Sequence, residues 1–389
     1  MQVMHFGAGN IGRGFVGDLL SKSDYKIIFV DVVDSIVNSI NKHNQYSVVT
    51  VGNEINKRVV KSVIAINIKD IESLKDEILD TDLITTSVGM SNLKSIGYTL
   101  KDLLNYKMKK NNSKLDIIAC ENALFASNIL KDTLLENTDE EFKKYIEENV
   151  GFPNCTVDRI VPNIDIKKEL DIDVGVESFC EWDIEKDKVK VNNSIKDANY
   201  VDNLGLYLER KLFLLNGAHA AIAYLGYLKS YKYIHEAIRD EYIRKIVFGY
   251  QDEVILALKN KYNINFIDLE NLDAYSKKTV LRFKNPYLKD EVIRVGRDPI
   301  RKLSYNDRLI SPLKLCNEYK IEPNNICIIL AAGYLFDYSK DKEAQEIQKY
   351  IIKFGLRKAI FKFSNLEGEK YLVERIEERY IELKNIGLK

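Results

Sequence analysis

The first 120 residues alternate short apolar runs with helical patterns of apolar and polar positions. Four runs are almost continuously apolar and end in small or polar residues, which is typical of strands buried on both faces of a parallel sheet. They are Val3–Phe6, Lys26–Val30, Asp82–Val88 and Leu115–Cys120. Between them, Ile11–Ser21 and Asp34–Lys42 carry apolar residues at helical spacing. This strand–helix alternation predicts a doubly wound α/β domain of the Rossmann type.

The pattern changes in the polar and charged stretch Asp183–Asn203, which we interpret as the passage between two domains. Beyond it, long amphipathic patterns predict helices. These are Tyr200–Leu228, Ile234–Lys259, Lys342–Phe354 and Glu367–Leu383. The apolar run Cys327–Phe336 has about half the length that a membrane span needs, so we expect a buried helix there. The sequence therefore predicts a Rossmann-type domain over residues 1–190 and a mainly α-helical domain over residues 191–389.

A glycine-rich turn follows the first predicted strand and precedes an amphipathic helix pattern. In a GxGxxG turn the first glycine permits a tight bend, the second lets the backbone approach a pyrophosphate, and the third lets helix and strand pack closely. The pyrophosphate then lies at the N-terminus of the helix. The residues expected to surround the dinucleotide are Val3, Met4, His5, Phe6, Gly7, Ala8, Gly9, Asn10, Ile11, Gly12, Arg13 and Gly14.

Three residues at the ends of later strands extend this predicted site. Asp31 follows the second strand about 20 residues beyond the glycine turn, where an acid binds the adenosine ribose diol. A carboxylate there repels a 2′-phosphate, so NAD is expected rather than NADP. Thr86 and Asn122 lie where two further strands end, in the crevice that dinucleotides occupy. For these two residues, a polar exit from a strand is an equally good interpretation.

One segment of the second half combines residues suited to alcohol oxidation: Lys211, Asn216 and His219 in the run ERKLFLLNGAHA. Oxidation needs a base for the hydroxyl proton while hydride leaves the carbon, and a buried lysine can be that base without a metal. On an α-helix, Lys211 and His219 would lie about 80° apart and Asn216 and His219 about 60° apart. From the residues alone, a solvated lysine, a cap and a core histidine are the stronger interpretation.

Composition narrows the classes of function. Lys plus Arg equals Asp plus Glu, at 58 each, so no global charge attracts nucleic acid or an anionic membrane. The five cysteines form no CxxC pair and the four histidines are scattered, which argues against a zinc site and a disulfide framework. We therefore expect no metal, no nucleic-acid or membrane partner, and a cytoplasmic location.

The segment Arg282–Arg308 stands out from this neutral background because it carries eight basic residues against four acids. Arginine matches phosphate oxygens with paired hydrogen bonds. For any single residue a solvated helix face is the simpler interpretation, but the segment as a whole favours a phosphate-binding role. Arg294, Arg297 and Arg301 are the first candidates.

Several motifs together resemble the polyol-specific long-chain dehydrogenase family, in the same order and spacing along nearly the whole chain. They are HFGAGNIGRGF, ACEN, GFPNCTVDRIVP, ERKLFLLNGAHA and RFKNPYLKDEVIRVGR. The resemblance implies metal-free, NAD-dependent oxidation of a polyol phosphate, D-mannitol 1-phosphate, to D-fructose 6-phosphate. It implies that Lys211 is the general base, that Asn216 donates to the oxyanion and that His219 positions the substrate. It also places Asn154 in the oxyanion hole.

Two other functions stay open on the sequence. A sister enzyme acting on mannitol, fructuronate or tagaturonate would share these motifs but would leave the basic segment without a purpose. A non-catalytic, NAD-binding redox sensor would need no base such as Lys211. The sequence leaves the oligomeric state open.

Overall fold

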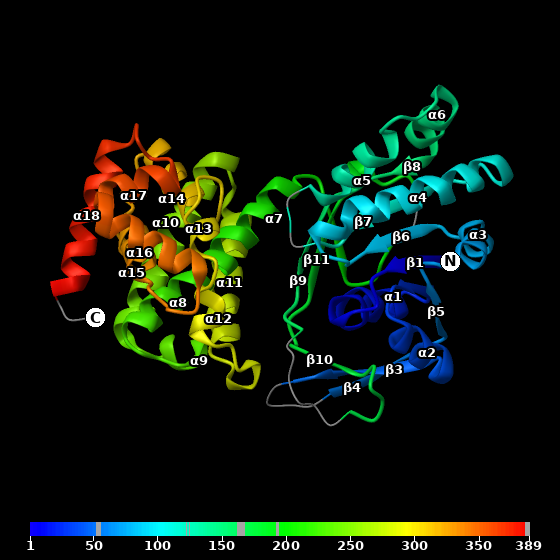
Figure 1. Cartoon of the computed structure of the whole chain (residues 1–389), viewed down its shortest axis with the longest axis horizontal. Coiled ribbons are helices and arrows are strands. Elements are labelled where there is room, and N and C mark those ends of the chain that lie inside the picture. Colours follow the sequence, from blue (N-terminus) through cyan, green and yellow to red (C-terminus); the bar gives the residue numbers. More distant parts are fainter. Residues whose placement is uncertain (52–55, 122, 124, 162–167, 192–193, 386–389) are drawn as a thin grey trace. The chain divides into compact units, whose positions relative to one another are not determined.

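The computed structural model describes residues 1–51, 56–121, 123, 125–161, 168–191 and 194–385. The chain forms two compact units, Met1–Leu208 and Glu209–Lys389 (Figure 1). Unit 1 carries the sheets, and unit 2 is built of helices. The fold class predicted from the sequence, a Rossmann-type sheet domain followed by a mainly helical domain, is confirmed.

The main sheet of unit 1 has six strands in the order β5-β2-β1-β6-β7-β8, and every neighbouring pair is parallel. The strands are β1 (Gln2–Phe6), β2 (Lys26–Asp31), β5 (Val63–Asn67), β6 (Leu83–Thr86), β7 (Leu115–Ala119) and β8 (Val150–Gly151). The four apolar runs of the sequence correspond to β1, β2, β6 and β7. β6 is shorter than predicted, because the chain leaves the sheet after Thr86.

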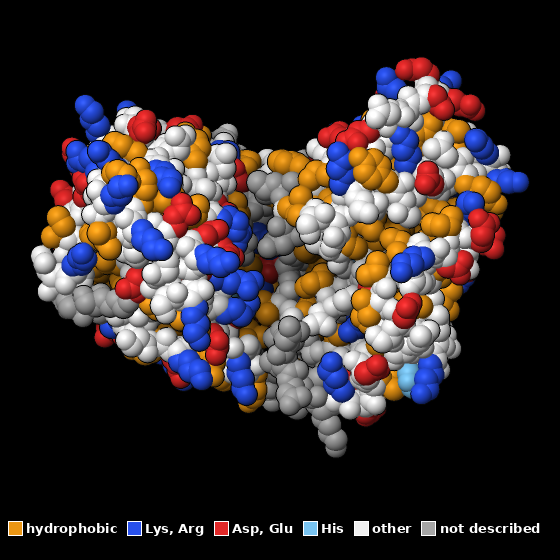
Figure 2. Space-filling model, viewed as in Figure 1, with side chains coloured by type: hydrophobic (Ala, Val, Ile, Leu, Met, Phe, Trp, Pro, Cys, Tyr) orange, Lys and Arg blue, Asp and Glu red, His pale blue; other side chains and the backbone are white. Residues whose placement is uncertain are grey.

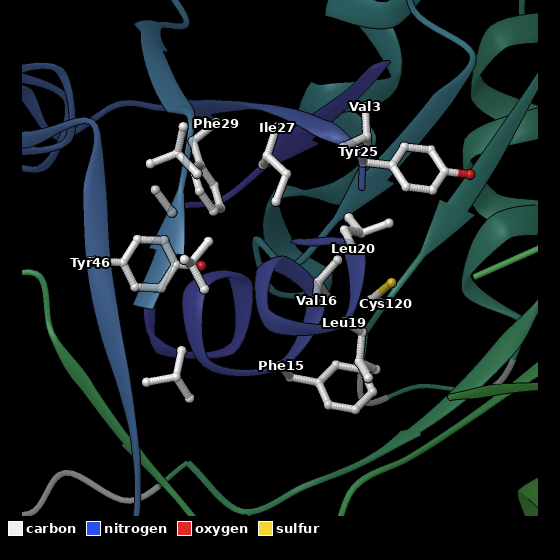
Figure 3. Packing of buried hydrophobic residues seen from close by; sticks show 14 of the residues in the cluster. Val3, Phe15, Val16, Leu19, Leu20, Tyr25, Ile27, Phe29, Tyr46 and Cys120 are labelled. Carbon is white, nitrogen blue, oxygen red and sulfur yellow. The ribbon is translucent and has the colours of Figure 1, made fainter. Parts of the chain in front are cut away.

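Helices cover both faces of this sheet. They are η1 (Gly12–Val16), α1 (Gly17–Lys22), α2 (Asp34–His43), α3 (Ile71–Ile78), α4 (Met90–Lys110), α5 (Ala126–Leu135) and α6 (Glu140–Asn149). Side chains alternate along β1, so that Val3 packs with η1, α1 and α2, whereas Met4 packs with α3 to α6. Figure 3 shows the first of these cores, in which Val16 and Leu20 lie on the side of their helix nearer Ile27, and Phe15 and Leu19 lie farther from the sheet.

Two small sheets complete unit 1, and the hydrophobic pattern did not predict them. One has the order β10-β3-β4, and the other has the order β12-β11-β9. The strands are β3 (Gln45–Thr50), β4 (Asn56–Lys61), β9 (Cys155–Asp158), β10 (Val174–Val176), β11 (Glu181–Glu185) and β12 (Ala198–Val201). The polar stretch Asp183–Asn203 is therefore not a plain passage, because β11 and β12 pair within it and bury Asp183.

The boundary between the units falls within α7 (Leu204–Arg210), which is followed directly by η3 (Lys211–Gly217) and α8 (Ala218–Leu228) of unit 2. The helices of unit 2 continue with α9 (Ile234–Ala237), α10 (Glu241–Tyr262), α11 (Phe266–Phe283), η4 (Pro286–Leu288), α12 (Val292–Gly296), α13 (Pro299–Lys302), α14 (Ile310–Glu318), α15 (Asn324–Leu335), α16 (Lys342–Phe354), α17 (Leu356–Ser364) and α18 (Lys370–Asn385). The apolar helices α8 and α15 pack against each other in the centre of the unit.

Most helix predictions for this half are confirmed, with two corrections. The apolar run Cys327–Phe336 forms the buried helix α15, and α16 has the predicted bounds. The pattern from Tyr200 begins in strand β12, and the pattern from Ile234 is broken between α9 and α10. Across the described ranges, no helix is both long and apolar enough to cross a lipid bilayer.

Candidate functional site

The three glycines of the GxGxxG turn meet three different demands. Gly7 has φ +101°, and a Cβ there would lie 2.7 Å from the carbonyl oxygen of Ser87. A Cβ on Gly12 would clash with the carbonyl oxygen of Gly7 and lie 2.7 Å from Nε2 of His5. A Cβ on Gly9, in contrast, would meet nothing within 4 Å. Gly7 and Gly12 are thus required by the protein's own packing, whereas Gly9 leaves room for a ligand to approach the backbone.

The helix after the turn does not start as the regular α-helix that the sequence predicted. η1 is a π-helical segment, wound with i→i+5 hydrogen bonds, before α1 continues normally. The Arg13 side chain is buried beneath this turn, where it donates to the carbonyls of Ala8 and Ile172. Arg13 therefore braces the turn from inside unit 1.

Asp31 lies at the end of β2 with its carboxylate turned toward the glycine turn. Oδ2 accepts the backbone N–H of Ala8 at 2.6 Å, and Oδ1 accepts that of Val33 at 2.9 Å. A carboxylate oxygen can accept more than one hydrogen bond. The acid is thus fixed in orientation and keeps capacity for a further donor.

A hydrogen-bonded chain supports the turn from the neighbouring strand. Ser87 Oγ donates to the Gly7 carbonyl at 3.1 Å, so its oxygen is left to accept from His5 Nε2 at 2.9 Å. His5 Nδ1 then accepts from Thr85 Oγ1, at 2.7 Å. Burial lowers the pKa of His5 to about 3, which keeps the ring neutral. His5 is therefore a brace behind the turn. The side chains of Val3, Met4 and Phe6 are buried in the sheet beside it.

The exit of β6 is organised by Glu121, which sequence reasoning missed. Its carboxylate accepts Thr86 Oγ1 at 2.9 Å, the Val88 N–H at 2.9 Å and the Gly89 N–H at 3.0 Å. Thr86, a predicted cofactor contact, is fully buried and points at this carboxylate. Asn122, the other predicted contact at these strand ends, lies outside the described residues.

Asn154 is buried in unit 1 just before β9, and its amide group is already engaged. Oδ1 accepts the Ser127 N–H at 3.1 Å. Nδ2 donates at 3.0 Å both to Oδ1 of Asn128 and to Oε2 of Glu185. In this arrangement the amide hydrogens needed for an oxyanion contact are bonded to protein oxygens. A role for Asn154 in the oxyanion hole stays a prediction.

Lys211, Asn216 and His219 lie on one continuous helix in unit 2, but not with the predicted geometry. η3 is π-helical from Lys211 to Gly217, so angles worked out for an α-helix do not apply. An α-helix would place Lys211 and Asn216 about 140° apart. With i→i+5 bonding, residues five apart lie about one turn above each other. The π winding thus brings Lys211 and Asn216 to one side of the helix.

His219 is held in the first turn of α8. Its ring stacks on Phe283 at a centroid distance of 4.9 Å. Nε2 lies 3.0 Å from Oδ2 of Asp290 but makes no well-aligned hydrogen bond with any described protein group. Burial first, and then nearby cations, lower the pKa of His219 to about 3. These cations are Arg294, Arg282, Arg308 and Lys302. These causes favour the neutral imidazole, whose Nε2 is buried and faces the Asp290 carboxylate.

The three predicted phosphate ligands are surface residues with acidic neighbours. Arg294 pairs with Asp290, while Arg297 lies 3.7 Å from Asp298 and Arg301 lies 3.9 Å from Asp307. Their side chains are between 54% and 62% exposed. Figure 2 shows such Lys and Arg side chains gathered over α12 and α13, interspersed with acids.

Three other cations of the basic segment are more enclosed, and we call Arg282, Lys302 and Arg308 the cationic cluster. Arg282 and Lys302 are buried, and the Arg308 side chain is 12% exposed. Burial, and then the charges of Arg308 and Arg301, lower the pKa of Lys302 to about 7. The sequence analysis included these residues in the basic segment but could not single them out, because their burial is decided by tertiary packing.

Metal ligands and disulfides were not expected from the sequence. Over the described ranges, no three His, Cys, Asp or Glu side chains are grouped so that they could hold a metal ion. All five cysteines are free thiols, and four of them are buried.

Comparisons with known proteins cover the whole chain. The family model of the mannitol dehydrogenase Rossmann domain matches residues 1–197, and that of the mannitol dehydrogenase C-terminal domain matches residues 203–384. The mannitol-1-phosphate 5-dehydrogenase of Clostridium acetobutylicum is 58% identical over 384 residues, which are 99% of each chain. That of Thermoanaerobacter pseudethanolicus is 54% identical and covers 99% of this chain and 98% of its own length.

Solved structures show the same fold at low sequence identity. The Pseudomonas fluorescens mannitol 2-dehydrogenase, in ternary complex with NAD and D-mannitol, has a TM-score of 0.75 at 18% identity, covering 100% of this chain and 92% of its own. A substrate-free D-sorbitol dehydrogenase has a TM-score of 0.85 at 17% identity, covering 99% and 93%. With two family models spanning its length and relatives above 50% identity, this chain belongs to the mannitol dehydrogenase family.

Proposed function

We propose that this chain is an oxidoreductase that catalyses the NAD-dependent, reversible oxidation of D-mannitol 1-phosphate to D-fructose 6-phosphate. The observation that carries the proposal is its 58% identity, over almost the full length of both chains, with a mannitol-1-phosphate 5-dehydrogenase. The glycine turn of unit 1 and the Lys211–Asn216–His219 set of unit 2 supply the chemistry that this reaction requires.

Unit 1 is the proposed NAD-binding domain. The open space over Gly9 and the fixed carboxylate of Asp31 fit a pyrophosphate and a ribose diol, respectively. Asp31 can accept from the diol while it holds the N–H groups of Ala8 and Val33. When bound, NAD supplies the acceptor for the hydride. The buried residues of the predicted set, such as His5 and Arg13, shape the turn that receives it.

Unit 2 supplies the proposed proton chemistry. Lys211 takes the hydroxyl proton of the substrate as the carbon–hydrogen bond gives up hydride, which leaves a carbonyl group. Asn216 donates to the oxygen on which negative charge develops. His219 orients the reacting hydroxyl, and burial and the neighbouring cations, which lower its pKa to about 3, make it a weaker base than Lys211 in this role.

We assign the substrate phosphate to the cationic cluster rather than to the exposed arginines alone. Arg282, Lys302 and Arg308 all act electrostatically on His219, so they lie close to the proposed site of reaction. Burial first, and then the charges of Arg308 and Arg301, lower the pKa of Lys302 to about 7, and a bound anion would offset the repulsion between these cations. Arg294 is linked to His219 through Asp290, because Arg294 pairs with Asp290 and Oδ2 of Asp290 lies 3.0 Å from Nε2 of His219.

A panel of substrates tests the function directly. NADH formation is followed by absorbance with mannitol 1-phosphate, mannitol, fructuronate and tagaturonate, each at several concentrations. Charge-assisted contacts with phosphate contribute roughly 1.5–3 kcal/mol each, so mannitol 1-phosphate should exceed mannitol by at least ~10² in kcat/KM. Comparable values for mannitol, or higher values for a hexuronate, would show that the enzyme is a sister dehydrogenase.

A further inference from the structure

The π-helical turn that carries Lys211 and Asn216 is held by two side chains of α10. Tyr250 Oη donates to the carbonyl of Phe213 at 2.8 Å, and Gln251 Nε2 donates to the carbonyl of Leu214 at 3.3 Å. Both carbonyls belong to η3. Tyr250 and Gln251 are almost completely buried. Two consecutive residues of α10 therefore donate side-chain hydrogen bonds to two consecutive backbone carbonyls of η3.

Tyr250 and the backbone at Gly217 are so close that no side chain fits between them. A Cβ at Gly217 would clash with Oη of Tyr250 and lie 2.9 Å from the carbonyl oxygen of Arg308. Glycine at this position therefore allows the hydroxyl to reach the helix. Tyr250 Oη is also 3.2 Å from the Arg308 carbonyl. One buried hydroxyl lies between the helix of Lys211 and the segment that carries a member of the cationic cluster.

A π turn is an uncommon winding, which persists where tertiary contacts favour it over the α-helix. If η3 relaxed to α-helical winding, Asn216 would lie about 140° from Lys211 around the helix axis. The side chains of Tyr250 and Gln251 donate to the carbonyls of Phe213 and Leu214. These hydrogen bonds stabilise the π winding, because the two carbonyls keep hydrogen-bond partners although the α-helical i→i+4 bonding is interrupted. The winding of η3 thus determines whether Lys211, the proposed base, and Asn216, the proposed oxyanion donor, lie on the same side of the helix.

We propose that Tyr250 and Gln251 are positioning residues, which hold η3 in its π winding and so keep Lys211 and Asn216 on one side of the helix. Tyr250 also sets the separation between this helix and the backbone of Arg308. The proposal rests on the proposed function, since it assigns these residues to the reaction of Lys211 and Asn216.

Tyr250→Phe is the principal test, because it removes the hydroxyl and keeps the ring. Its matched control is Tyr334→Phe, in which an equally buried tyrosine of unit 2 loses one hydroxyl contact, 2.6 Å from Ser364 Oγ. Both variants should lose similar thermal stability. Tyr250→Phe should lower kcat about 10- to 100-fold, the range for small misplacement of catalytic groups, with KM for NAD unchanged. Tyr334→Phe should keep the wild-type kcat.

A double-mutant cycle separates positioning from general loosening of the core. If Tyr250 acts by aligning Asn216, the loss from Tyr250→Phe should be much smaller when Asn216→Ala is already present. Gln251→Met, which keeps length and removes the donor, should behave like a weaker Tyr250→Phe. Additive losses, or an equal fall of kcat in Tyr334→Phe, would overturn the proposal.

A readout without turnover distinguishes this failure from a failure of the proposed function. The rate at which an acylating reagent modifies Lys211 is followed by peptide mass spectrometry as a function of pH. Tyr250→Phe should shift this profile, whereas Tyr334→Phe should reproduce the wild-type profile. An unchanged profile in Tyr250→Phe overturns the positioning role even if the wild-type enzyme prefers another substrate.

Discussion

The hydrogen bonds and packing around individual charged side chains of this protein determine the chemistry that each of them can carry out. Asp31 is anchored by two backbone N–H groups, and Lys302 is buried among arginines. Lys211 lies at the start of a π turn. Each of these three residues can be tested by one substitution with a distinct kinetic signature.

Lys211→Ala tests the proposed base. Without the amine, kcat for alcohol oxidation should fall by at least ~10²-fold, the lower end for general acid–base catalysis. NAD binding should persist, because the glycine turn belongs to unit 1. The measurement is the pH profile of kcat beside NAD titration. Asn216→Ala should lower kcat and keep the titration, since an amide does not ionise. A near-normal kcat in Lys211→Ala would move the search for the base to His219.

Asp31 should set the choice of cofactor. A carboxylate at the ribose diol repels a 2′-phosphate, so the enzyme should favour NAD over NADP at least tenfold, equivalent to about 1.4 kcal/mol. In Asp31→Asn the repulsion is gone and the ratio should narrow, with a stability loss of ~1 kcal/mol from the weakened backbone contacts. The ratio of kcat/KM for the two cofactors measures this. Equal use of both by the unmodified enzyme contradicts the role.

Lys302 should give the reaction an alkaline limit. Burial and the neighbouring Arg308 and Arg301 lower its pKa to about 7, so its charge is present below that pH and is lost above it. Phosphate binding needs the charged form, and kcat/KM for mannitol 1-phosphate should therefore fall as pH rises through about 7. Because kcat/KM reports the ionisations of the free enzyme, this alkaline limb, the fall with rising pH, should be smaller in the pH profile of kcat. Lys302→Gln should remove the limb, and mannitol should not show it. An alkaline limb of equal size with mannitol would assign it to another group.

At the level of elements, the protein uses two π-helical segments that carry proposed site residues, η1 directly before α1 and η3 between α7 and α8. Both are tied to a more distant element by a buried tyrosine: Tyr46 donates to the Arg13 carbonyl at 2.9 Å, and Tyr250 to that of Phe213 at 2.8 Å. A side chain elsewhere in the unit thus supports each irregular turn.

The glycine turn allows a matched pair of substitutions that separates folding from binding. Gly12→Ala forces a Cβ into the Gly7 carbonyl and should destabilise unit 1 by about 1–3 kcal/mol, as overpacking does. Gly9→Ala meets nothing within 4 Å, so Tm should be unchanged while KM for NAD rises. Thermal denaturation and NAD titration of both variants give the comparison. A loss of Tm in Gly9→Ala, or unaltered NAD binding, would show that no ligand approaches this backbone.

Across the whole molecule, the two units supply different halves of the proposed chemistry, NAD binding from unit 1 and proton transfer from unit 2. If a lysine is the base, the reaction needs no Lewis acid. Activity should then survive exhaustive chelation followed by gel filtration, measured as kcat with mannitol 1-phosphate. Loss of activity on chelation, restored by added zinc, would indicate a different class of dehydrogenase.

Local physical chemistry is what made much of this protein predictable from its sequence. Continuous apolar runs predicted β1, β2, β6 and β7, because a strand covered on both faces must be apolar throughout. The glycine turn and Asp31 were equally predictable, since φ at Gly7 and the spacing to the second strand are local properties. The two-part architecture followed from a change of hydrophobic period. The small sheets were missed because a strand such as β4 buries little apolar surface.

Tertiary structure decided the properties that arise between distant segments. The winding of η3 depends on donors from α10, so an α-helical angle computed from Lys211 to His219 could not be right. The enclosure of Lys302, which is the largest cause of its lowered pKa, follows from packing around α13, and the adjacent Arg301 adds only a smaller part. The engagement of the Asn154 amide by Asn128 and Glu185 is likewise invisible in the motif. The sequence determined which residues were available for catalysis, and packing between elements determined which of them are aligned, buried and charged.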